Sequence, residues 1–121
     1  MVTARRCLGN EVEELALRFL KQKGYKIIAR NYRTRYGELD LVTKFRDRIV
    51  FIEVKTRKTH TFGSPEQAID YRKQRHLALM AKWYMMEQKR KEAIFQIDCL
   101  AIDLSHGRGE ISHLENIVQD W

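Results

Sequence analysis

The sequence predicts a single α/β domain over residues 1–121, with a mixed central sheet flanked by helices and the element order αβββαβ. Three observations predict this class. Apolar residues recur at helical spacing near the N-terminus, three closely spaced segments rich in β-branched residues follow, and a strong helix-start signal comes next. A chain of this length can bury a core without disulfides. Cys7 and Cys99 lie far apart and form no CxxC pair, which fits a reducing cytoplasm.

The first helix is expected to end near Gly24, because glycine readily adopts the left-handed conformation that closes many helices. Its apolar stripe consists of Leu8, Val12, Leu15, Ala16, Phe19 and Leu20. Residues 25–33, 38–45 and 48–57 are then predicted to form three strands. The pair Tyr36-Gly37 marks a turn between the first two, and the short junction Arg46-Asp47 indicates a hairpin between the second and third.

The second helix is expected to begin at Ser64 and to run to about Arg90. The run Ser64-Pro65-Glu66-Gln67 places an N-cap serine, a proline at the first helical position and a glutamine whose side chain can reach back to the cap. Residues 94–104 read as a fourth strand. The tail over residues 111–121 has the weakest pattern, and no further strand is predicted there.

The charge balance narrows the class of partner. Twenty-three Lys and Arg residues oppose 16 Asp and Glu residues, which gives a formal net charge of +7 and an isoelectric point near 9.6. Excess positive charge attracts polyanions, of which nucleic acids are the commonest in a cytosol, although the same charges also suit ordinary solvated faces. The longest apolar runs are too short to span a membrane, and no signal-peptide stretch follows Arg5 and Arg6.

Polar residues on the second and third expected strands require an explanation. Side chains alternate along a strand, so Glu38 and Asp40 are expected on one face and their leucine neighbours on the other. Glu53 and Lys55 likewise share a face of the third strand. Paired strands can therefore present Asp40, Glu53 and Lys55 together, which suits a hard dication and a phosphate substrate. A cross-strand cluster of solvated charges has the same pattern.

The two helices add further candidates. Glu13 lies at the edge of the first helix's apolar stripe, where it can lean over the sheet as a further acidic group or form a surface ion pair. Lys73 and His76 interrupt the apolar face of the second helix. Lys73 can extend to solvent or meet a phosphate or a carboxylate, whereas a lone histidine such as His76 usually serves packing.

At these residues the sequence resembles the uncharacterised bacterial YraN-type family. The resemblance covers nearly the whole chain. It is carried by Gly9, Glu13, Ala16, Gly24-Tyr25, Arg30-Asn31, Arg33, the run Gly37-Glu38-Leu39-Asp40-Leu41-Val42, the run Val50-Phe51-Ile52-Glu53-Val54-Lys55-Thr56-Arg57, Gly63, Lys73 and Asp98.

That family looks like a restriction-endonuclease-like sandwich with the PD-(D/E)xK nuclease core, similar in layout to archaeal Holliday-junction resolvases. The resemblance implies metal binding by Asp40 and Glu53, a catalytic lysine at Lys55 and a helix-borne acidic role for Glu13. No proline precedes Asp40, a departure from the nuclease motif that is usual for this family.

These observations together predict a cytoplasmic, Mg²⁺- or Mn²⁺-dependent endonuclease that acts on nucleic acid, most simply DNA, with structure-specific cleavage of branched or flapped DNA among the options. The expected nucleic-acid contacts are Arg33, Arg35, Arg57 and Lys73. Two alternatives remain at this point: a nucleic-acid-binding protein that keeps the nuclease fold without turnover, and an interaction protein whose carboxylates are structural. The choice between DNA and RNA and the number of subunits stay open, with a homodimer among the options.

Overall fold

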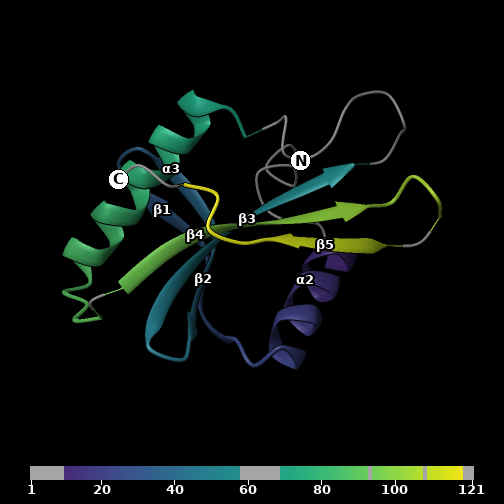
Figure 1. Cartoon of the computed structure of the whole chain (residues 1–121), viewed down its shortest axis with the longest axis horizontal. Helices are drawn as coiled ribbons and strands as arrows, with labels where there is room; N and C mark the ends of the chain where they lie inside the picture. The colour runs from purple at the N-terminus through teal and green to yellow at the C-terminus, as the bar shows by residue number, and fades with distance from the viewer. Residues whose placement is uncertain (1–9, 58–68, 93, 108, 119–121) are drawn as a thin grey trace.

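The computed structural model describes residues 10–57, 69–92, 94–107 and 109–118, which form a mixed α/β structure (Figure 1). Two helices and five strands lie in these ranges. They are α2 (Asn10–Gln22), β1 (Lys26–Thr34), β2 (Gly37–Phe45), β3 (Arg48–Arg57), α3 (Tyr71–Glu87), β4 (Ile94–Asp103) and β5 (Glu110–Leu114).

The five strands form one mixed sheet with the order β1-β2-β3-β4-β5. Neighbouring strands run antiparallel, except that β3 and β4 are parallel. Two parallel neighbours need a long crossover connection, and α3 lies within it. The expected mixed sheet with flanking helices is therefore confirmed at this level.

The first helix agrees with its sequence pattern. Its acidic first turn, with Glu11 and Glu13, suits the positive end of the helix dipole. Gly24 closes the helix with φ of +96°, and the Tyr25 amide donates to the Leu20 carbonyl at 3.0 Å. The helix ends where a residue without a Cβ can take a left-handed conformation.

The second helix does not run continuously from Ser64 to Arg90 as expected. Helix α3 begins at Tyr71, because Asp70 is extended and its carboxylate accepts a hydrogen bond from the Lys73 amide at 2.9 Å. This side chain is the actual N-cap. Residues 64–67 lie outside the described residues, so the predicted capping box is not described.

Strand β5 was not expected, and a buried aspartate helps to hold it. The Asp98 carboxylate on β4 is fully buried and lies 2.8 Å from His113 Nε2 and 2.8 Å from the Asn116 amide. Lys23 Nζ lies 2.7 Å from His113 Nδ1. An ammonium can only donate, so Nδ1 accepts and Nε2 carries the proton that it gives to Asp98. This chain of contacts joins β5 to β4 and to the end of α2.

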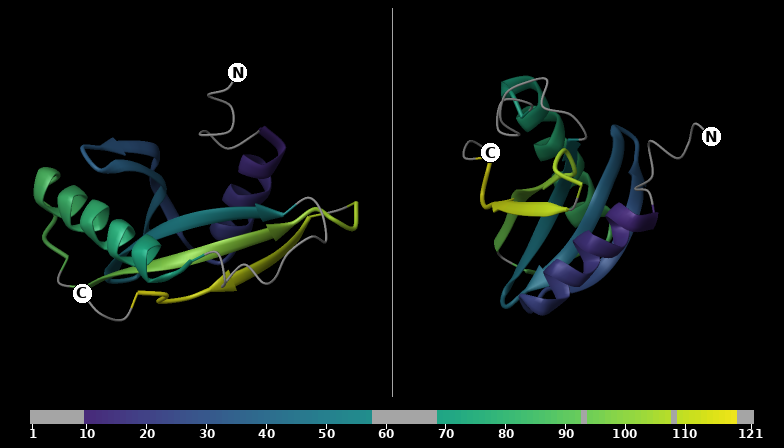
Figure 2. Two further views of the ribbon diagram at one scale, coloured as in Figure 1. Left: turned by 90° about the horizontal axis from the view of Figure 1, so that it is seen from above. Right: turned by 90° about the vertical axis from the view of Figure 1, so that its right-hand side faces the viewer.

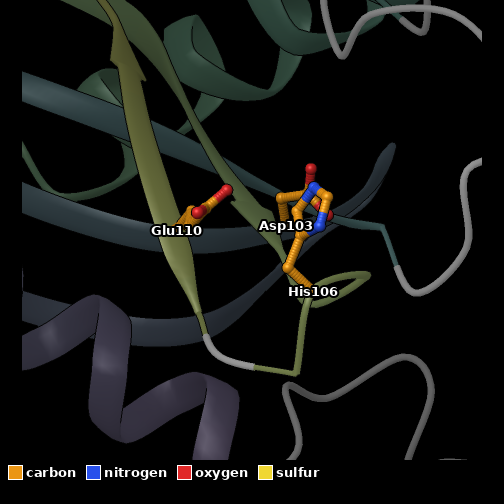
Figure 3. Close-up of side chains that lie close together, drawn as sticks. All are labelled: Asp103, His106 and Glu110. Atoms are coloured by element: carbon orange, nitrogen blue, oxygen red, sulfur yellow. The ribbon is translucent and has the colours of Figure 1, made fainter.

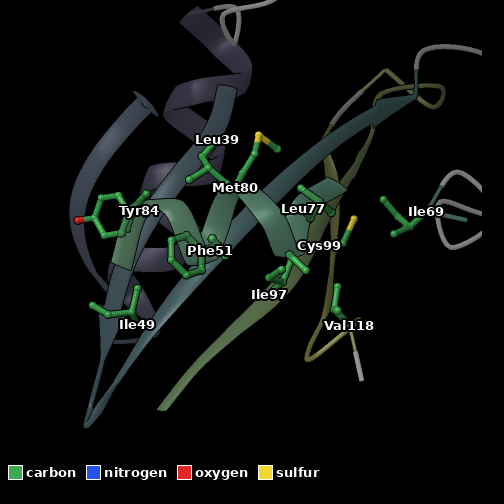
Figure 4. Packing of buried hydrophobic residues seen from close by; sticks show 13 residues of the cluster. Leu39, Ile49, Phe51, Ile69, Leu77, Met80, Tyr84, Ile97, Cys99 and Val118 are labelled. Atoms are coloured by element: carbon green, nitrogen blue, oxygen red, sulfur yellow. The ribbon is translucent and has the colours of Figure 1, made fainter. Parts of the chain in front are cut away.

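The helices cover opposite faces of the sheet (Figure 2). Figure 4 shows the α3 face, where Phe51, Leu77, Met80 and Tyr84 form the centre of a buried cluster. The α2 face buries Ala16 and Leu20 of the helix with sheet residues. These sheet residues are Leu41, Val50, Ile52, Val54, Leu100 and Ile102. Odd and even positions of β3 thus serve different cores, as strand alternation requires.

Candidate functional site

The site begins where β2 and β3 separate. Their paired register runs from Phe45↔Arg48 to Leu41↔Ile52, and Asp40 is the next residue on β2. There the Val54 amide donates to Asp40 Oδ2 at 2.8 Å. A side-chain oxygen thus takes the place that a strand carbonyl would otherwise fill, and it satisfies a backbone donor at the divergence.

This arrangement corrects the expected faces of β2. Leu39 and Leu41 were expected on one face, but Leu39 packs in the α3 cluster and Leu41 in the α2 cluster. The alternation therefore breaks at Asp40. Across the sheet, Asn31 of β1 has φ of +51° and lies between the pairs Arg30↔Leu41 and Tyr32↔Leu39. A backbone irregularity on the neighbouring strand accompanies the break.

Glu53 is the most buried acid of the site, with its side chain 8% exposed. Its Oε2 lies 3.4 Å from Lys55 Nζ and 3.1 Å from Lys73 Nζ. Lys55 comes from the same strand, whereas Lys73 comes from the first turn of α3. A carboxylate this buried requires cationic partners to remain charged, and two lysines provide them.

The pKa of Asp40 shows that the two acids act on one another. Burial and, to a smaller extent, the negative charge of Glu53 raise the pKa of the Asp40 carboxyl from 3.8 to about 7, against the hydrogen bond from Val54 and the positive charges of Lys73 and Lys55. Four charged side chains from β2, β3 and α3 therefore share one electrostatic site. A carboxyl poised near neutral pH is typical of functional sites, although ion-pair networks also produce it.

The acidic site lies on the face of the sheet that α3 covers. Glu53 and Lys55 alternate with Ile52 and Val54 along β3 and so share the α3 face with Phe51. Lys73 of α3 reaches the same carboxylate. The lysine that interrupts the apolar face of this helix thus meets a carboxylate, one of the two roles left open by the sequence.

Glu13 occupies a different neighbourhood. Its described partner is Arg30 on β1, with which it forms a hydrogen-bonded ion pair. Arg30 lies opposite Leu41, a residue of the α2 core, so this pair belongs to the α2 side of the sheet. The structure therefore brings Asp40, Glu53, Lys55 and Lys73 together and places Glu13 with Arg30.

The three arginines that were predicted to contact nucleic acid differ in how exposed their side chains are and in how they are paired. Arg33 has a side chain that is 83% exposed and lies 3.6 Å from Glu38, so its ion pair is weak. Arg35 is exposed at the tip of the β1–β2 hairpin. Arg57 is more constrained, because its guanidinium lies 2.9 Å from Asp103 Oδ2 of the neighbouring strand.

The donor atoms around Asp40 suit a hard divalent cation. Asp40 and Glu53 offer carboxylate oxygens, which Mg²⁺ and Mn²⁺ prefer. Two further oxygens on these strands, Glu38 Oε1 and Asn31 Oδ1, are buried without a hydrogen-bond partner. Both belong to residues beside or across from Asp40 in the sheet. The donor set thus fits the cation that the family resemblance implies.

A second group of possible ligands lies at the β4–β5 turn and was missed by the sequence analysis. Ligand atoms of Asp103, His106 and Glu110 lie within 4.8 Å of one another (Figure 3). Hydrogen bonds from Ser105 and Arg57 hold the pKa of Asp103 well below its usual range. Both oxygens of Asp103 already accept these hydrogen bonds. The cluster of Asp103, His106 and Glu110 is therefore better explained as a set of side chains that stabilises the β4–β5 turn.

The family model described as Uncharacterised protein family UPF0102 matches residues 12–102, which is most of the chain. The chain belongs to this family. Similar UPF0102 proteins include one from Syntrophomonas wolfei subsp. wolfei, 46% identical over 90% of this chain and 95% of the relative. Another, from Caldicellulosiruptor saccharolyticus, is 44% identical over 81% and 83% of the two chains. A third, from Thermodesulfovibrio yellowstonii, is 42% identical over 93% and 96%.

Membership of UPF0102 confirms the YraN-type resemblance. The match spans Glu13, Asp40, Glu53, Lys55 and Lys73, so the whole proposed site lies within the UPF0102 region. No helix in the part of the chain that the structure describes is long and apolar enough to cross a membrane. The description of the family names no reaction, and the chemistry must be argued from the site.

Proposed function

We propose that this UPF0102 protein is a divalent-cation-dependent phosphodiesterase of the cytoplasm that cleaves nucleic acid, with DNA as the substrate. The observation that carries the proposal is the pair of acids Asp40 and Glu53, held together where β2 and β3 separate and flanked by two lysines. An open sheet with a helix on each face and this acid–acid–lysine set supports a restriction-endonuclease-like core.

The net charge supports a polyanionic substrate. A formal charge of +7 draws phosphate backbones toward the protein over long range. The exposed Arg33 and Arg35 project from the hairpin that leads directly into Asp40. Arg57 continues β3 two residues beyond Lys55, so cations extend from the acidic site in both directions.

The site residues then have distinct roles. Asp40 and Glu53 would hold the cation, and Asp40 would use Oδ1 because Oδ2 already accepts the Val54 amide. When bound, a divalent cation supplies Lewis-acid chemistry that activates water and neutralises charge on the phosphate. Lys55, anchored beside Glu53, is placed to donate to a phosphate oxygen as negative charge develops on it. Lys73 balances charge from α3. Glu13, paired with Arg30 on the α2 side, takes no direct part in this set.

One observation favours the alternative of binding without turnover. Lys55 and Lys73 both contact Glu53 Oε2, so this carboxylate is already neutralised without a dication. A cation would have to compete with both ammonium groups. A nuclease-like protein that kept its acids only to hold two lysines would have the same contacts and would bind nucleic acid without cleaving it.

A cleavage assay separates these two functions. The purified protein is incubated with linear, nicked, flapped and four-way DNA, with Mn²⁺ and with EDTA. The test variants are Asp40→Asn and Lys55→Ala, and the control is Asp47→Asn, an exposed aspartate in the β2–β3 turn. We expect Mn²⁺-dependent cleavage by the wild type and by the control.

The two test variants should differ in kind. Asp40→Asn removes a charge that the cation requires, so Mn²⁺ binding and cleavage should both disappear while DNA binding persists. Lys55→Ala should keep Mn²⁺ binding and lose about 100- to 1000-fold in the rate of cleavage, because electrostatic support of the transition state is lost. DNA binding by the wild type without cleavage of any substrate would establish the non-catalytic alternative. Flat Mn²⁺ titrations for all proteins would exclude the metal site.

A further inference from the structure

The tip of the β1–β2 hairpin carries an exposed aromatic ring beside a cation. The Tyr36 residue is 40% exposed, and its ring lies 6.0 Å from the Trp83 ring of α3 at an interplanar angle of 87°. The Arg35 guanidinium carbon lies 5.7 Å from the centroid of each ring. Arg35, Tyr36 and Trp83 thus form one unit, called here the aromatic platform. Aromatic rings flanked by arginines are the usual surface on which unpaired bases stack.

The hairpin tip is held against α3 by contacts other than the exposed ring. His76 Nε2 of α3 is hydrogen-bonded to the Tyr36 carbonyl. Gly37 has φ of +139°, and a Cβ at that position would lie 3.3 Å from Met80 Sδ and 3.4 Å from His76 Cε1. These backbone contacts fix the turn, so the exposed part of the Tyr36 ring is not required to dock it. A ring held in place before binding costs little conformational entropy when a ligand stacks on it.

Two connections place the aromatic platform near the acidic site, one along β2 and one through α3. Tyr36 precedes Asp40 by four residues, a distance of about 14 Å in an extended strand. Through α3, His76 holds the Tyr36 carbonyl and lies one helical turn after Lys73, which contacts Glu53. At the duplex rise of about 3.4 Å per nucleotide this separation spans about four stacked nucleotides, and an unpaired strand, which is more extended, spans it with fewer.

We propose that the aromatic platform binds an unpaired nucleobase of a single-stranded DNA segment, which stacks on Tyr36 while Arg35 and Arg33 contact its phosphates. This inference rests on the proposed function, because it assigns the substrate class of the Asp40–Glu53 site as DNA with a single strand beside the scissile phosphate. The exposed arginines favour a polyanion over an apolar protein segment at this ring. Every base has a π-face, so no sequence preference is expected.

A binding assay in EDTA tests the aromatic platform apart from cleavage. The chain has two tryptophans, so Trp121→Phe leaves Trp83 as the fluorescent reporter beside Tyr36. Ligands are a single-stranded oligonucleotide, a flapped duplex and a blunt duplex of matched length. In this background Tyr36→Phe keeps the ring, whereas Tyr36→Leu keeps an apolar side chain and removes the π-face.

We expect Trp83 fluorescence to change on adding the single strand or the flap. Tyr36→Leu should weaken binding of these two ligands about 5- to 100-fold, and binding of the blunt duplex by less than about twofold. Tyr36→Phe should bind like its parent. Equal losses for single strand and blunt duplex, or no loss for either, would overturn the proposal.

A comparison of Arg35→Ala with Arg46→Ala tests the aromatic platform without altering the tyrosine, and Arg46→Ala is the matched control. Arg46 also lies over an aromatic ring, 5.0 Å from Phe45, but at the opposite end of β2. Nine residues of strand separate the two turns, a distance of about 30 Å. Arg35→Ala should reduce single-strand affinity several-fold more than Arg46→Ala does. Equal losses would indicate diffuse charge attraction and would refute a defined site, even if Tyr36→Leu proved unstable.

The two proposals fail in different ways. Protein that binds single strands through Tyr36 but never cleaves DNA in Mn²⁺ would exclude the nuclease and keep the base-binding site. Protein whose Tyr36→Leu variant cleaves flapped and blunt DNA in the wild-type ratio would keep the nuclease and exclude the aromatic platform.

Discussion

Replacing Asp40 by asparagine should make the metal-free protein more stable at alkaline pH. Asparagine has nearly the same size, and its side-chain oxygen can still accept the hydrogen bond from the Val54 amide. What it removes is a buried negative charge beside Glu53. The substitution therefore isolates the cost of ionising this carboxyl inside the folded protein.

The sign and size follow from the pKa of Asp40, which burial and Glu53 raise from 3.8 to about 7. Below about pH 4 the Asp40 carboxyl is protonated in both the folded and the unfolded state, so the folded protein does not lose stability by keeping it neutral. As the pH rises toward 7, the unfolded state ionises while the folded state keeps its proton, so stability falls. Each pH unit costs about 1.4 kcal/mol in this window, so the wild type should lose about 2–3 kcal/mol between pH 5 and pH 8.

The assay is urea denaturation of both proteins in EDTA at pH 5 and at pH 8. The free energy of unfolding of Asp40→Asn should rise relative to wild type by about 2–3 kcal/mol between the two pH values. Titrating groups far from Asp40 behave alike in both proteins and cancel in this comparison. Asp47→Asn, in the exposed turn, should show the same difference from wild type at both pH values. A pH-independent difference for Asp40→Asn, or a variant less stable than wild type at pH 8, would refute the argument.

Two further predictions concern ligands. Mn²⁺ binds the ionised form of Asp40, so its affinity should rise up to about tenfold per pH unit below pH 7 and level off above it, with proton release below pH 7. Calorimetry in two buffers of different ionisation enthalpy measures both effects, and an affinity independent of pH would contradict the role of Asp40. Removing Arg33 and Arg35 together should lower the salt dependence of DNA binding by about two counterions. The control, removal of Lys89 and Lys91 beyond the end of α3, should lower it less; equal changes would exclude a defined DNA track.

Glu53 and Lys55 were predictable as neighbours because they lie on a locally patterned strand. The alternation of Ile52, Glu53, Val54 and Lys55 placed both charged residues on one face, and the structure shows Ile52 and Val54 in the core of the other. Their partners were harder to predict. For Lys73 the sequence left open solvent, a phosphate or a carboxylate as its partner, and its contact with Glu53 depends on how α3 crosses the sheet.

Other features had no local signal. The break in alternation at Asp40 arises where one strand leaves another, so the expected faces of Leu39 and Leu41 were wrong. Strand β5 is short and polar, and its stability depends on a buried contact between His113 and Asp98 of the neighbouring strand. Neither residue indicates this pairing in its own sequence neighbourhood.

The sequence by itself determined the helix that ends at Gly24, the hairpin strands and the placement of Glu53 and Lys55 on one strand face, because periodicity and turn chemistry act between near neighbours. Only the tertiary structure decided that Lys73 neutralises Glu53 and that Tyr36 meets Trp83. It also raised the pKa of Asp40 to about 7. These properties depend on burial and on charges from distant segments, which exist only once the sheet and α3 have packed together.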